Sequence, residues 1–309
     1  MNIIILGAAG FIGTNLALEL VKDQESHITL VDRNFQRLKI LKALCRNKVE
    51  IQKRDLIREP DFESFLQGQD IVYQLISTTV PAISNQQIQK EINENVIYMS
   101  KLLDACVKCH VKKIIFPSSG GTVYGIQNGC PLQEDMETWP INSYGVQKLM
   151  NEKLLYLYHY MYGLDYRIVR LANPYGPYQK PDGVQGVIAA FVYKAIKREP
   201  IHIYGDGSVI RDYIYIDDAI RAMINITTGE KKTKLFNVGS GKGISISQLL
   251  KIIESILGIT LYIDYFPGRT VDVPVNFLDI SRYENAFGSL VSIPLEDGIR
   301  KTADYFCRQ

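Results

Sequence analysis

Cysteine is scarce in this chain, which has five among 309 residues, scattered along its length. A small secreted domain stabilised by disulfides carries more cysteines at closer spacing, so we expect free thiols in a reducing compartment, the cytoplasm. The four histidines and the scattered acidic residues show no spacing typical of metal ligands. The sequence therefore predicts a cytoplasmic protein without a metal site.

Long apolar runs and an excess of one charge are also missing. The longest apolar stretches have the length of a strand, and none reaches the roughly 20 residues of a membrane span. The chain enters an apolar segment directly after Met1-Asn2, without the basic start of a signal peptide. The net charge of +2 provides no general attraction to nucleic acid or membranes. We therefore expect no membrane span and no nucleic-acid partner.

The first half of the chain alternates short apolar segments with amphipathic ones. The pattern predicts strands at 3–6, 28–31, 49–52, 71–75, 113–116 and 166–170, with helices at 11–21, 36–45, 61–66, 86–109 and from 144 onward. Strands that are apolar on both faces and separated by helices indicate a doubly wound parallel sheet, an α/β fold of the Rossmann type.

The second half is less regular and predicts a smaller α/β domain. Its pattern indicates helices at 187–197, 217–226 and 246–257, two more helices near the end, and strands at 201–204, 235–238 and 260–265. No repeat or free linker separates the halves. We predict one domain over 1–173, to which 208–242 return, and a second over 174–309 that closes a cleft with it.

A glycine turn joins the first predicted strand to the first predicted helix. Gly7, Gly10 and Gly13 form a G-x-x-G-x-x-G pattern, and Phe11 and Ile12 begin the helix. Glycines allow a tight turn and a close approach of the backbone to a pyrophosphate, which then faces the helix N-terminus. This strand–turn–helix context predicts a dinucleotide site.

Acidic residues follow the next two predicted strands. Asp32 can accept hydrogen bonds from a ribose diol, and its charge would repel a 2′-phosphate, so NAD is favoured over NADP. Asp55 and Leu56 are placed to meet the adenine. A turn aspartate at a strand end explains Asp55 equally well.

Tyr144 and Lys148 stand four residues apart near a predicted helix start, with Ser143 as the expected N-cap. This spacing puts both side chains on one face, where the lysine charge should lower the tyrosine pKa and make it usable in proton transfer. A tyrosine and a lysine at this spacing are more often an ordinary pair on a helix surface than a catalytic pair. The other motifs of the chain are needed to choose between a catalytic pair and a surface pair.

Together these motifs resemble the extended short-chain dehydrogenase/reductase family, in its nucleotide-sugar epimerase/dehydratase branch, and most of all UDP-glucose and UDP-N-acetylglucosamine 4-epimerases. The resemblance covers essentially the whole chain. It rests on the glycine turn, Asp32, Asp55, Ser118-Ser119, Tyr124-Gly125, Tyr144-x-x-x-Lys148, Arg170-x-x-Asn173-x-Tyr175-Gly176-Pro177, Gly205-Asp206-Gly207, Arg211-Asp212-Tyr213, Asp217-Asp218 and Arg269-x-x-Asp272-x-Pro274.

The resemblance implies a role for each of these positions. Tyr144 would be the acid/base, and Lys148 would assist it and hold the nicotinamide ribose. Hydride transfer from carbon 4 of the sugar to NAD would give a 4-keto sugar that receives the hydride back on its other face. Further NAD-binding positions are Leu75, Ser77, Asn95 and Ser118. The nucleoside-diphosphate sugar would contact Asn173, Tyr204, Arg211, Arg269 and Asp272.

One position departs from the family pattern. The loop after the strand at 113–116 has Gly120 where relatives carry a serine or threonine hydroxyl that binds the 4-oxygen of the sugar. We expect Ser119 or Thr122 to supply this hydroxyl. Alternatively, the serines only bond the loop and the cofactor. The loop also lacks the Asp-Glu pair of 4,6-dehydratases, which leaves decarboxylases and reductases as alternatives.

The resemblance carries two further expectations. Asn276 stands where a bulky tyrosine restricts related epimerases to plain hexoses, so N-acetylhexosamines should be accepted. The helices at 86–109 and 144–162 form the dimer interface of this family, so we expect a homodimer. A regulator that binds NAD without catalysis is the alternative outside the enzymes, and Tyr144, Lys148, Arg211 and Arg269 argue against it.

Overall fold

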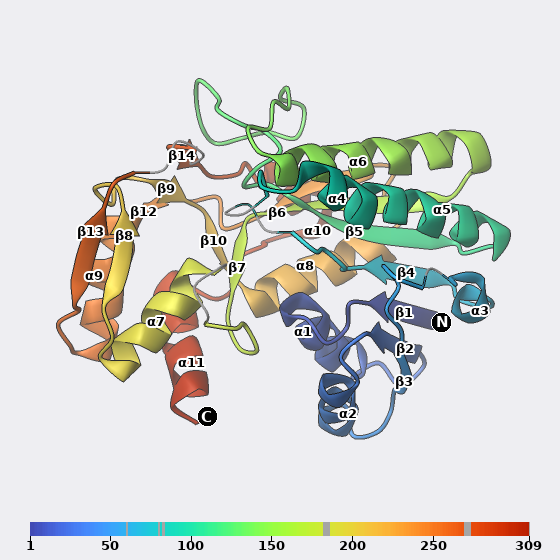
Figure 1. The fold of residues 1–309 in the computed structure, drawn as a ribbon, viewed down its shortest axis with the longest axis horizontal. Helices are drawn as coiled ribbons and strands as arrows, with labels where there is room; N and C mark the ends of the chain where they lie inside the picture. Colours follow the sequence, from blue (N-terminus) through green and yellow to red (C-terminus); the bar gives the residue numbers. More distant parts are fainter. Residues whose placement is uncertain (60, 80, 82–83, 182–185, 269–272, 309) are drawn as a thin grey trace.

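A parallel sheet of seven strands forms the centre of the computed structural model (Figure 1). The structure describes residues 1–59, 61–79, 81, 84–181, 186–268 and 273–308. The strand order is β11–β6–β5–β4–β1–β2–β3, and each pairing is parallel. The predicted doubly wound sheet is confirmed. Its strands are β1 (Asn2–Leu6), β2 (His27–Asp32), β3 (Glu50–Lys53), β4 (Ile71–Gln74), β5 (Lys113–Ser119), β6 (Asp165–Leu171) and β11 (Leu235–Val238).

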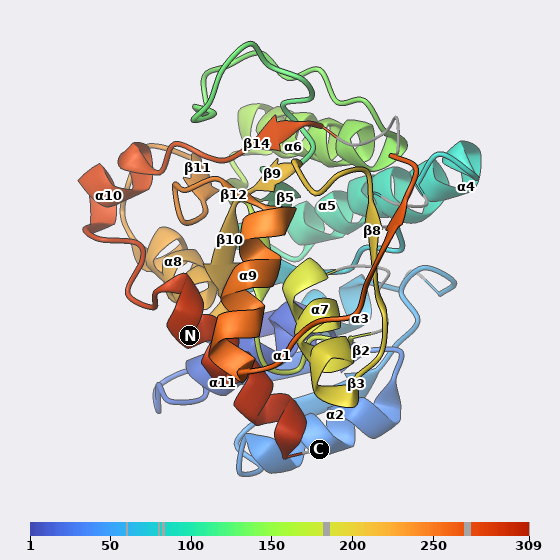
Figure 2. The same cartoon turned by 90° about the vertical axis from the view of Figure 1, so that its left-hand side faces the viewer.

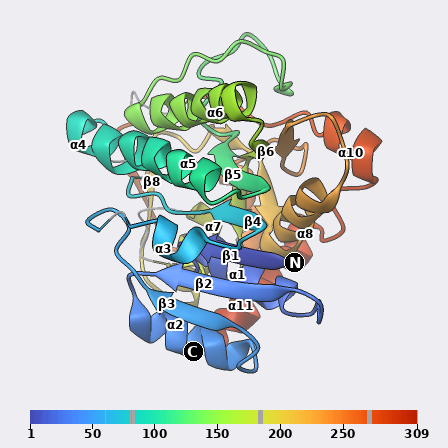
Figure 3. The same cartoon turned by 90° about the vertical axis from the view of Figure 1, so that its right-hand side faces the viewer.

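Helices cover both faces of this sheet because the strand side chains alternate between two cores. Ile3 and Ile5 of β1 belong to one buried cluster, and Ile4 and Leu6 belong to the other. On the first face lie α1 (Phe11–Leu20), α2 (Phe35–Leu44) and α8 (Ile216–Thr228). On the second lie α3 (Glu63–Leu66), α5 (Tyr98–Lys108) and α6 (Ser143–Tyr162), with α5 and α6 side by side in Figure 3.

The strand order reverses between β1 and β4, which fixes where a ligand can bind. Chain connections leave β1 toward β2 on one side and β4 toward β5 on the other. In open parallel sheets, ligands bind in the crevice that this reversal opens at the carboxyl ends of the strands. The turn after β1, the loop after β4 and the loop after β5 all lie at this edge.

A smaller group of elements packs beside the sheet (Figures 1 and 2). Strand β8 pairs with β13, β7 pairs with β10, and β9 lies between β12 and β14. These strands are β7 (Asn173–Tyr175), β8 (Ile201–Tyr204), β9 (Ile210–Arg211), β10 (Tyr213–Tyr215), β12 (Ile244–Ser245), β13 (Ile263–Phe266) and β14 (Val275–Asn276). The helices are α7 (Val187–Lys197), α9 (Ile246–Leu257), α10 (Ser281–Phe287) and α11 (Leu295–Cys307). The exact division into domains stays a prediction.

Two local predictions differ from the structure, and some short strands were not predicted. The helix predicted at 86–109 is interrupted by a π-helical turn, so that α4 (Ile88–Ile92) is followed by η1 (Asn93–Ile97) and then α5. The strand predicted at 260–265 begins only at Ile263. The short strands β9, β12 and β14 carry too few residues for a periodic signal. Among the described helices, none has the length and apolar character needed to span a bilayer.

Candidate active site

The glycine turn forms a backbone cradle between β1 and α1. Gly7 has a φ of +84°, and its carbonyl accepts a 3.1 Å hydrogen bond from the Gly10 amide. A Cβ atom on Gly13 would lie 2.5 Å from the Gly7 carbonyl oxygen, so only glycine lets α1 pack this close to the turn. No side chain of the described residues caps α1, and the first turn of this helix contains no acidic residue. Its free N–H groups therefore fit the pyrophosphate of a dinucleotide.

Asp32 lies against this cradle at the end of β2. Its carboxylate accepts hydrogen bonds from the amides of Ala9 (3.1 Å) and Asn34 (2.8 Å). Sequence reasoning missed Arg37, whose guanidinium donates a 3.2 Å hydrogen bond to the Ala9 carbonyl. A helix position carries no sequence signal for such a contact.

Asp55 and Leu56, which follow β3, differ in how deeply their side chains are buried. Asp55 is partly buried and lies 3.8 Å from the Arg58 side chain. The Leu56 side chain is fully packed in the core beneath the sheet. Any contact of Leu56 with an adenine therefore has to come from its backbone.

The loop after β4 is tied to helix η1 through Asn95. The Asn95 side chain accepts a 3.0 Å hydrogen bond from the Thr78 amide and donates 3.0 Å and 2.8 Å hydrogen bonds to the Thr78 hydroxyl and the Glu91 carbonyl. The Leu75 amide donates to the Leu6 carbonyl and keeps the loop beside the glycine turn. A small hollow is lined by Ser77, Asn95, Phe116, Tyr144, Lys148 and Asn151, among others.

Helix α6 begins one residue earlier than expected. Asn142, not Ser143, is its N-cap, and the Asn142 side chain accepts a 2.8 Å hydrogen bond from the Gly145 amide. The Ser143 hydroxyl instead donates to the buried carboxylate of Glu91 at 2.9 Å. Gln147 donates to the same carboxylate oxygen at 3.0 Å. This polar cluster joins the start of α6 to α4.

Tyr144 and Lys148 lie on one side of α6, as predicted, with the lysine Nζ 5.6 Å from the centre of the tyrosine ring. Burial raises the pKa of Tyr144 to about 12, and a hydrogen bond with the Ser119 side chain acts against that rise. The expected lowering of the tyrosine pKa was wrong, because desolvation of the buried phenolate raises this pKa. Burial also lowers the pKa of Lys148 to about 8, while the charge of Glu152 acts in the opposite direction.

The loop after β5 distinguishes the candidate hydroxyl groups. Ser119 shares a hydrogen bond with Tyr144, whereas the Thr122 hydroxyl is buried with no hydrogen-bond partner among the described residues. Ser118 donates a 2.5 Å hydrogen bond to Glu152. Gly120 has no room for a side chain, because a Cβ atom there would lie 2.6 Å from a methyl group of Leu278. Of the two candidates, Ser119 has the contact that proton transfer needs.

The candidate substrate residues come from the smaller group of elements. The Asn173 side chain donates to the Asp212 carbonyl at 2.9 Å, and Arg211 donates to the carbonyls of Ile210 (2.9 Å) and Val273 (2.5 Å). Tyr204 is 43% exposed at the end of β8. Arg269 and Asp272 lie outside the described residues.

Asn276 is fully buried beside the loop after β5. Its amide nitrogen donates a 3.1 Å hydrogen bond to the Gly120 carbonyl, and its amide oxygen has no partner among the described residues. Asp212 fixes the same region by accepting hydrogen bonds from Ser240, Gly241 and Leu278. The substrate-side loops are thereby joined to the loop that carries Ser119.

Comparison with known proteins is consistent with this geometry. The model of the NAD dependent epimerase/dehydratase family matches residues 3–239. The chain belongs to this family. A UDP-glucose 4-epimerase of Mycolicibacterium smegmatis is 31% identical over 309 residues, which cover 99% of this chain and 98% of that protein. The prediction of an NAD-dependent enzyme of the epimerase type is thereby confirmed.

Solved structures of family members superpose closely. A UDP-glucose 4-epimerase of Thermotoga maritima with UDP-glucose has a TM-score of 0.92 at 32% identity, covering 100% of this chain and 99% of that one. A UDP-N-acetylglucosamine 4-epimerase of Methanobrevibacter ruminantium with UDP-N-acetylmuramic acid has a TM-score of 0.90 at 29% identity, covering 99% and 98%. Relatives with other activities include a dTDP-4-dehydro-6-deoxyglucose reductase of Escherichia coli (31%) and a UDP-N-acetyl-alpha-D-glucosaminuronate decarboxylase of Bacillus cytotoxicus (27%).

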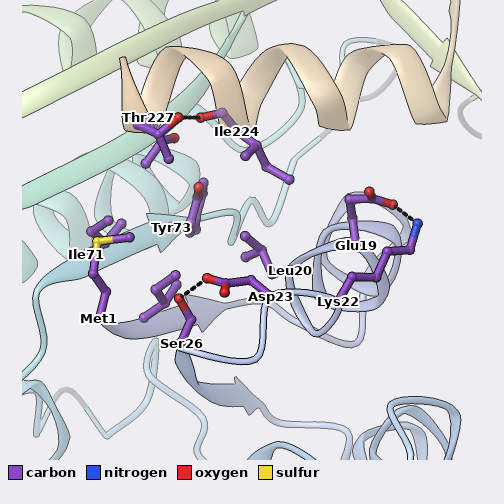
Figure 4. A pocket seen from close by; sticks show the side chains of 12 residues that line it. Met1, Glu19, Leu20, Lys22, Asp23, Ser26, Ile71, Tyr73, Ile224 and Thr227 are labelled. Carbon is purple, nitrogen blue, oxygen red and sulfur yellow. Dashed lines mark hydrogen bonds and ion pairs between the residues drawn. The ribbon is translucent and has the colours of Figure 1, made fainter. Parts of the chain in front are cut away.

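One cavity among the described residues is distinct from the site at the carboxyl ends of the strands. It has a volume of about 370 Å³ and lies at the amino ends of β1 and β4, lined by Met1, Ile3, Leu20, Tyr73, Ile224 and Thr227, among others (Figure 4). The glycine turn and Tyr144 lie at the carboxyl ends of the strands. A cavity at the opposite edge cannot serve the NAD site. Among the described residues, no cluster of histidine, cysteine or acidic side chains could hold a metal ion.

Proposed function

We propose that the protein is a 4-epimerase that interconverts UDP-sugars through a transient 4-keto intermediate. The observation that carries this proposal is the hydrogen bond between Ser119 and Tyr144 beside Lys148, at the edge of the sheet where the glycine turn lies. Oxidation at a sugar hydroxyl needs one group that removes the hydroxyl proton and another that binds the same oxygen. Tyr144 and Ser119 are placed for these two roles.

NAD, when bound, supplies the reversible acceptor for the hydride of carbon 4. The residues proposed to hold it are the glycine turn for the pyrophosphate and Asp32 for the adenosine ribose. Lys148 is proposed to hold the nicotinamide ribose. Its Nζ donates a 2.8 Å hydrogen bond to the Pro117 carbonyl, which directs the ammonium group along the end of β5.

The protonation state of Tyr144 fits a reversible proton transfer. With its pKa raised to about 12, the phenol is protonated at neutral pH and can return a proton to the 4-keto oxygen. The Ser119 hydrogen bond favours the phenolate, the form that accepts the proton from the sugar hydroxyl. Ser119 thereby assists the base and also contacts the 4-oxygen.

The substrate contacts are proposed from the smaller group of elements. Arg211 and Arg269 are suited to the diphosphate because a guanidinium group binds phosphate through two parallel hydrogen bonds. Tyr204 offers an exposed ring on which a base can stack. Asn173 and Asp272 complete the proposed contacts to the sugar nucleotide.

We propose that N-acetylhexosamines are accepted alongside plain hexoses. Asn276 is smaller than tyrosine, and its amide oxygen, which has no partner among the residues that the structure describes, can accept a hydrogen bond from the N–H group of a 2-acetamido substituent. The similarity to a UDP-N-acetylglucosamine 4-epimerase supports this proposal.

Two parallel incubations separate the candidate reactions. Purified protein is mixed with UDP-glucose, UDP-N-acetylglucosamine or UDP-glucuronic acid without added cofactor, and the products are separated by ion-exchange chromatography. An equilibrium mixture of two 4-epimers supports the proposal. Loss of carbon dioxide from the uronic acid would identify a decarboxylase. A parallel incubation contains a nucleoside-diphosphate 4-keto sugar, and its consumption only with added NADH would identify a reductase. No conversion in either incubation would favour a regulator.

A homodimer is proposed from an exposed apolar stripe on α6. Val146, Met150, Leu157 and Met161 recur at helical spacing, and each is between 40% and 53% exposed. Tyr156, Tyr160 and Tyr162 of the same helix are also exposed, whereas Tyr158 is buried and donates a hydrogen bond to Asp104. We further propose a cytoplasmic location and a role in supplying precursors of cell-surface polysaccharides.

A further inference from the structure

Helix α6 carries a third charged side chain in line with Tyr144 and Lys148. Glu152 follows Lys148 by four residues, so it lies one turn further along the same side of the helix. Its side chain is 4% exposed, as is that of Arg170 on β6. Arg170 binds the Glu152 carboxylate with two atoms, Nη2 at 2.8 Å and Nε at 3.1 Å. A buried carboxylate is stable only with such partners.

The lysine and the glutamate are anchored on neighbouring residues of β5. Lys148 donates to the Pro117 carbonyl at 2.8 Å, and its Nζ lies 4.6 Å from the centre of the Phe116 ring. The next residue, Ser118, donates its hydroxyl hydrogen to Glu152 at 2.5 Å. Lys148 and Glu152 are therefore held in a fixed relation by three consecutive residues of one strand.

Few other charged groups face Lys148 from the described elements around it. Helix α6 contributes Tyr144 and Glu152, and β6 contributes Arg170, which is engaged with Glu152. Helix α4 contributes Glu91, whose carboxylate accepts hydrogen bonds from Ser143 and Gln147. The residues of β5 and η1 in the small hollow are uncharged. Burial pulls the pKa of Lys148 down to about 8, and the Glu152 charge opposes this fall.

We propose that Glu152 is a positioning residue whose carboxylate, clamped by Arg170 and Ser118, keeps the ammonium group of Lys148 charged and directed into the active site. Its importance for turnover rests on the proposed function. Its effect on Lys148 does not, because Ser118, which donates to Glu152, is the next residue after Pro117, whose carbonyl holds Lys148. Without Glu152, the partly buried lysine would lose its proton at a lower pH.

The direct test measures the titration of Lys148 itself. The protein is acetylated briefly at a series of pH values, and the labelled fraction of the Lys148 peptide is followed by mass spectrometry. In Glu152→Gln we expect the midpoint of labelling to fall by about one pH unit. Glu152→Asp keeps the charge and should retain most of the original midpoint. Glu199→Gln removes the same charge at an exposed position and should leave the midpoint unchanged.

The single variant leaves Arg170 buried without its counter-charge, which is strongly destabilising. The double variant Glu152→Gln/Arg170→Gln removes both charges and provides a second route to the same measurement. The proposal predicts a lowered Lys148 midpoint here too. A midpoint equal to that of the unmodified protein in either folded variant would overturn it.

An activity profile separates this inference from the proposed function. If the protein epimerises UDP-sugars, the alkaline limb of kcat/KM should move to lower pH in Glu152→Gln by the same amount as the labelling midpoint. If no UDP-sugar is converted but the midpoint still falls, the proposed reaction is wrong and the role of Glu152 stands. If Glu152→Gln is active and neither the alkaline limb of kcat/KM nor the midpoint of Lys148 labelling moves, the role of Glu152 is structural only.

Discussion

The Asn276 side chain donates a 3.1 Å hydrogen bond to the main-chain carbonyl of Gly120. The residue proposed to set the sugar preference is therefore joined to the loop in which the expected hydroxyl is replaced by glycine. A change at Asn276 should affect both the space beside the sugar and the position of this loop. The two effects can be measured separately, as substrate preference and as overall rate.

Asn276→Tyr should restrict the enzyme to plain hexoses. The bulkier ring would occupy space beside the 2-substituent, and we expect kcat/KM for UDP-N-acetylglucosamine to fall at least about tenfold relative to that for UDP-glucose, which corresponds to about 1.4 kcal/mol. The readout is the ratio of the two values, so a general loss of rate does not affect it. An unchanged ratio in a folded variant would contradict the proposed role of Asn276.

Ser119→Ala should slow epimerisation far more than Thr122→Ala. Removing a hydroxyl that binds the reacting oxygen costs on the order of 10²-fold in kcat. The loss of its hydrogen bond should also raise the pKa of Tyr144 further, because that bond now favours the phenolate. The Thr122 hydroxyl has no hydrogen-bond partner within the described part of the chain, and we expect its variant to stay within about threefold of the original rate. Full activity in both variants would exclude both hydroxyl groups.

Gly120→Ser should destabilise the protein instead of restoring a second hydroxyl. A Cβ atom at this position would lie 2.6 Å from a Leu278 methyl group and 3.1 Å from the Arg170 carbonyl oxygen. Overpacking of this kind costs about 1–3 kcal/mol, measured as the free energy of unfolding in urea. Gly120→Ser/Leu278→Ala relieves the closer contact and serves as the matched control. Equal stability of Gly120→Ser and the original protein would show that the loop moves freely.

The sheet, the glycine turn and the Tyr144–Lys148 pair were predictable because each depends on residues close together in the sequence. Strand periodicity, a turn glycine and an i to i+4 spacing are local signals. The contact between Asn276 and Gly120 joins residues 156 positions apart, and no local sequence pattern predicts it. Sequence reasoning therefore found the missing hydroxyl at Gly120 but not the Leu278 contact that fills its space.

Two further errors have the same cause. Ser143 was expected to cap α6, but Glu91, 52 positions away, accepts its hydroxyl hydrogen, and Asn142 caps the helix instead. The pKa of Tyr144 was expected to fall because only its neighbour Lys148 was visible in the sequence. Burial raises it, and burial depends on the whole fold.

The rate of epimerisation should fall as the pH rises through about 8. Lys148 has its pKa lowered from 10.5 to about 8, so its charged form is present below that pH and is lost above it. The measurement is kcat/KM against pH, which reports groups of the free enzyme. Lys148→Arg keeps a charge that does not titrate in this range, and its profile should lack the alkaline limb although the rate is lower. A limb that persists unchanged in this variant would assign it to another group.

Charges on the apolar stripe of α6 should separate the proposed dimer. Met150 and Leu157 are 40% and 44% exposed, and a charged side chain buried without a partner in an interface is strongly unfavourable. We expect Met150→Lys/Leu157→Glu to sediment as a monomer in analytical ultracentrifugation, while the unmodified protein sediments as a dimer. Lys251→Glu changes a charge on the exposed side of α9 and should not alter the assembly. If the unmodified protein is already a monomer at micromolar concentration, this stripe is not a dimer interface.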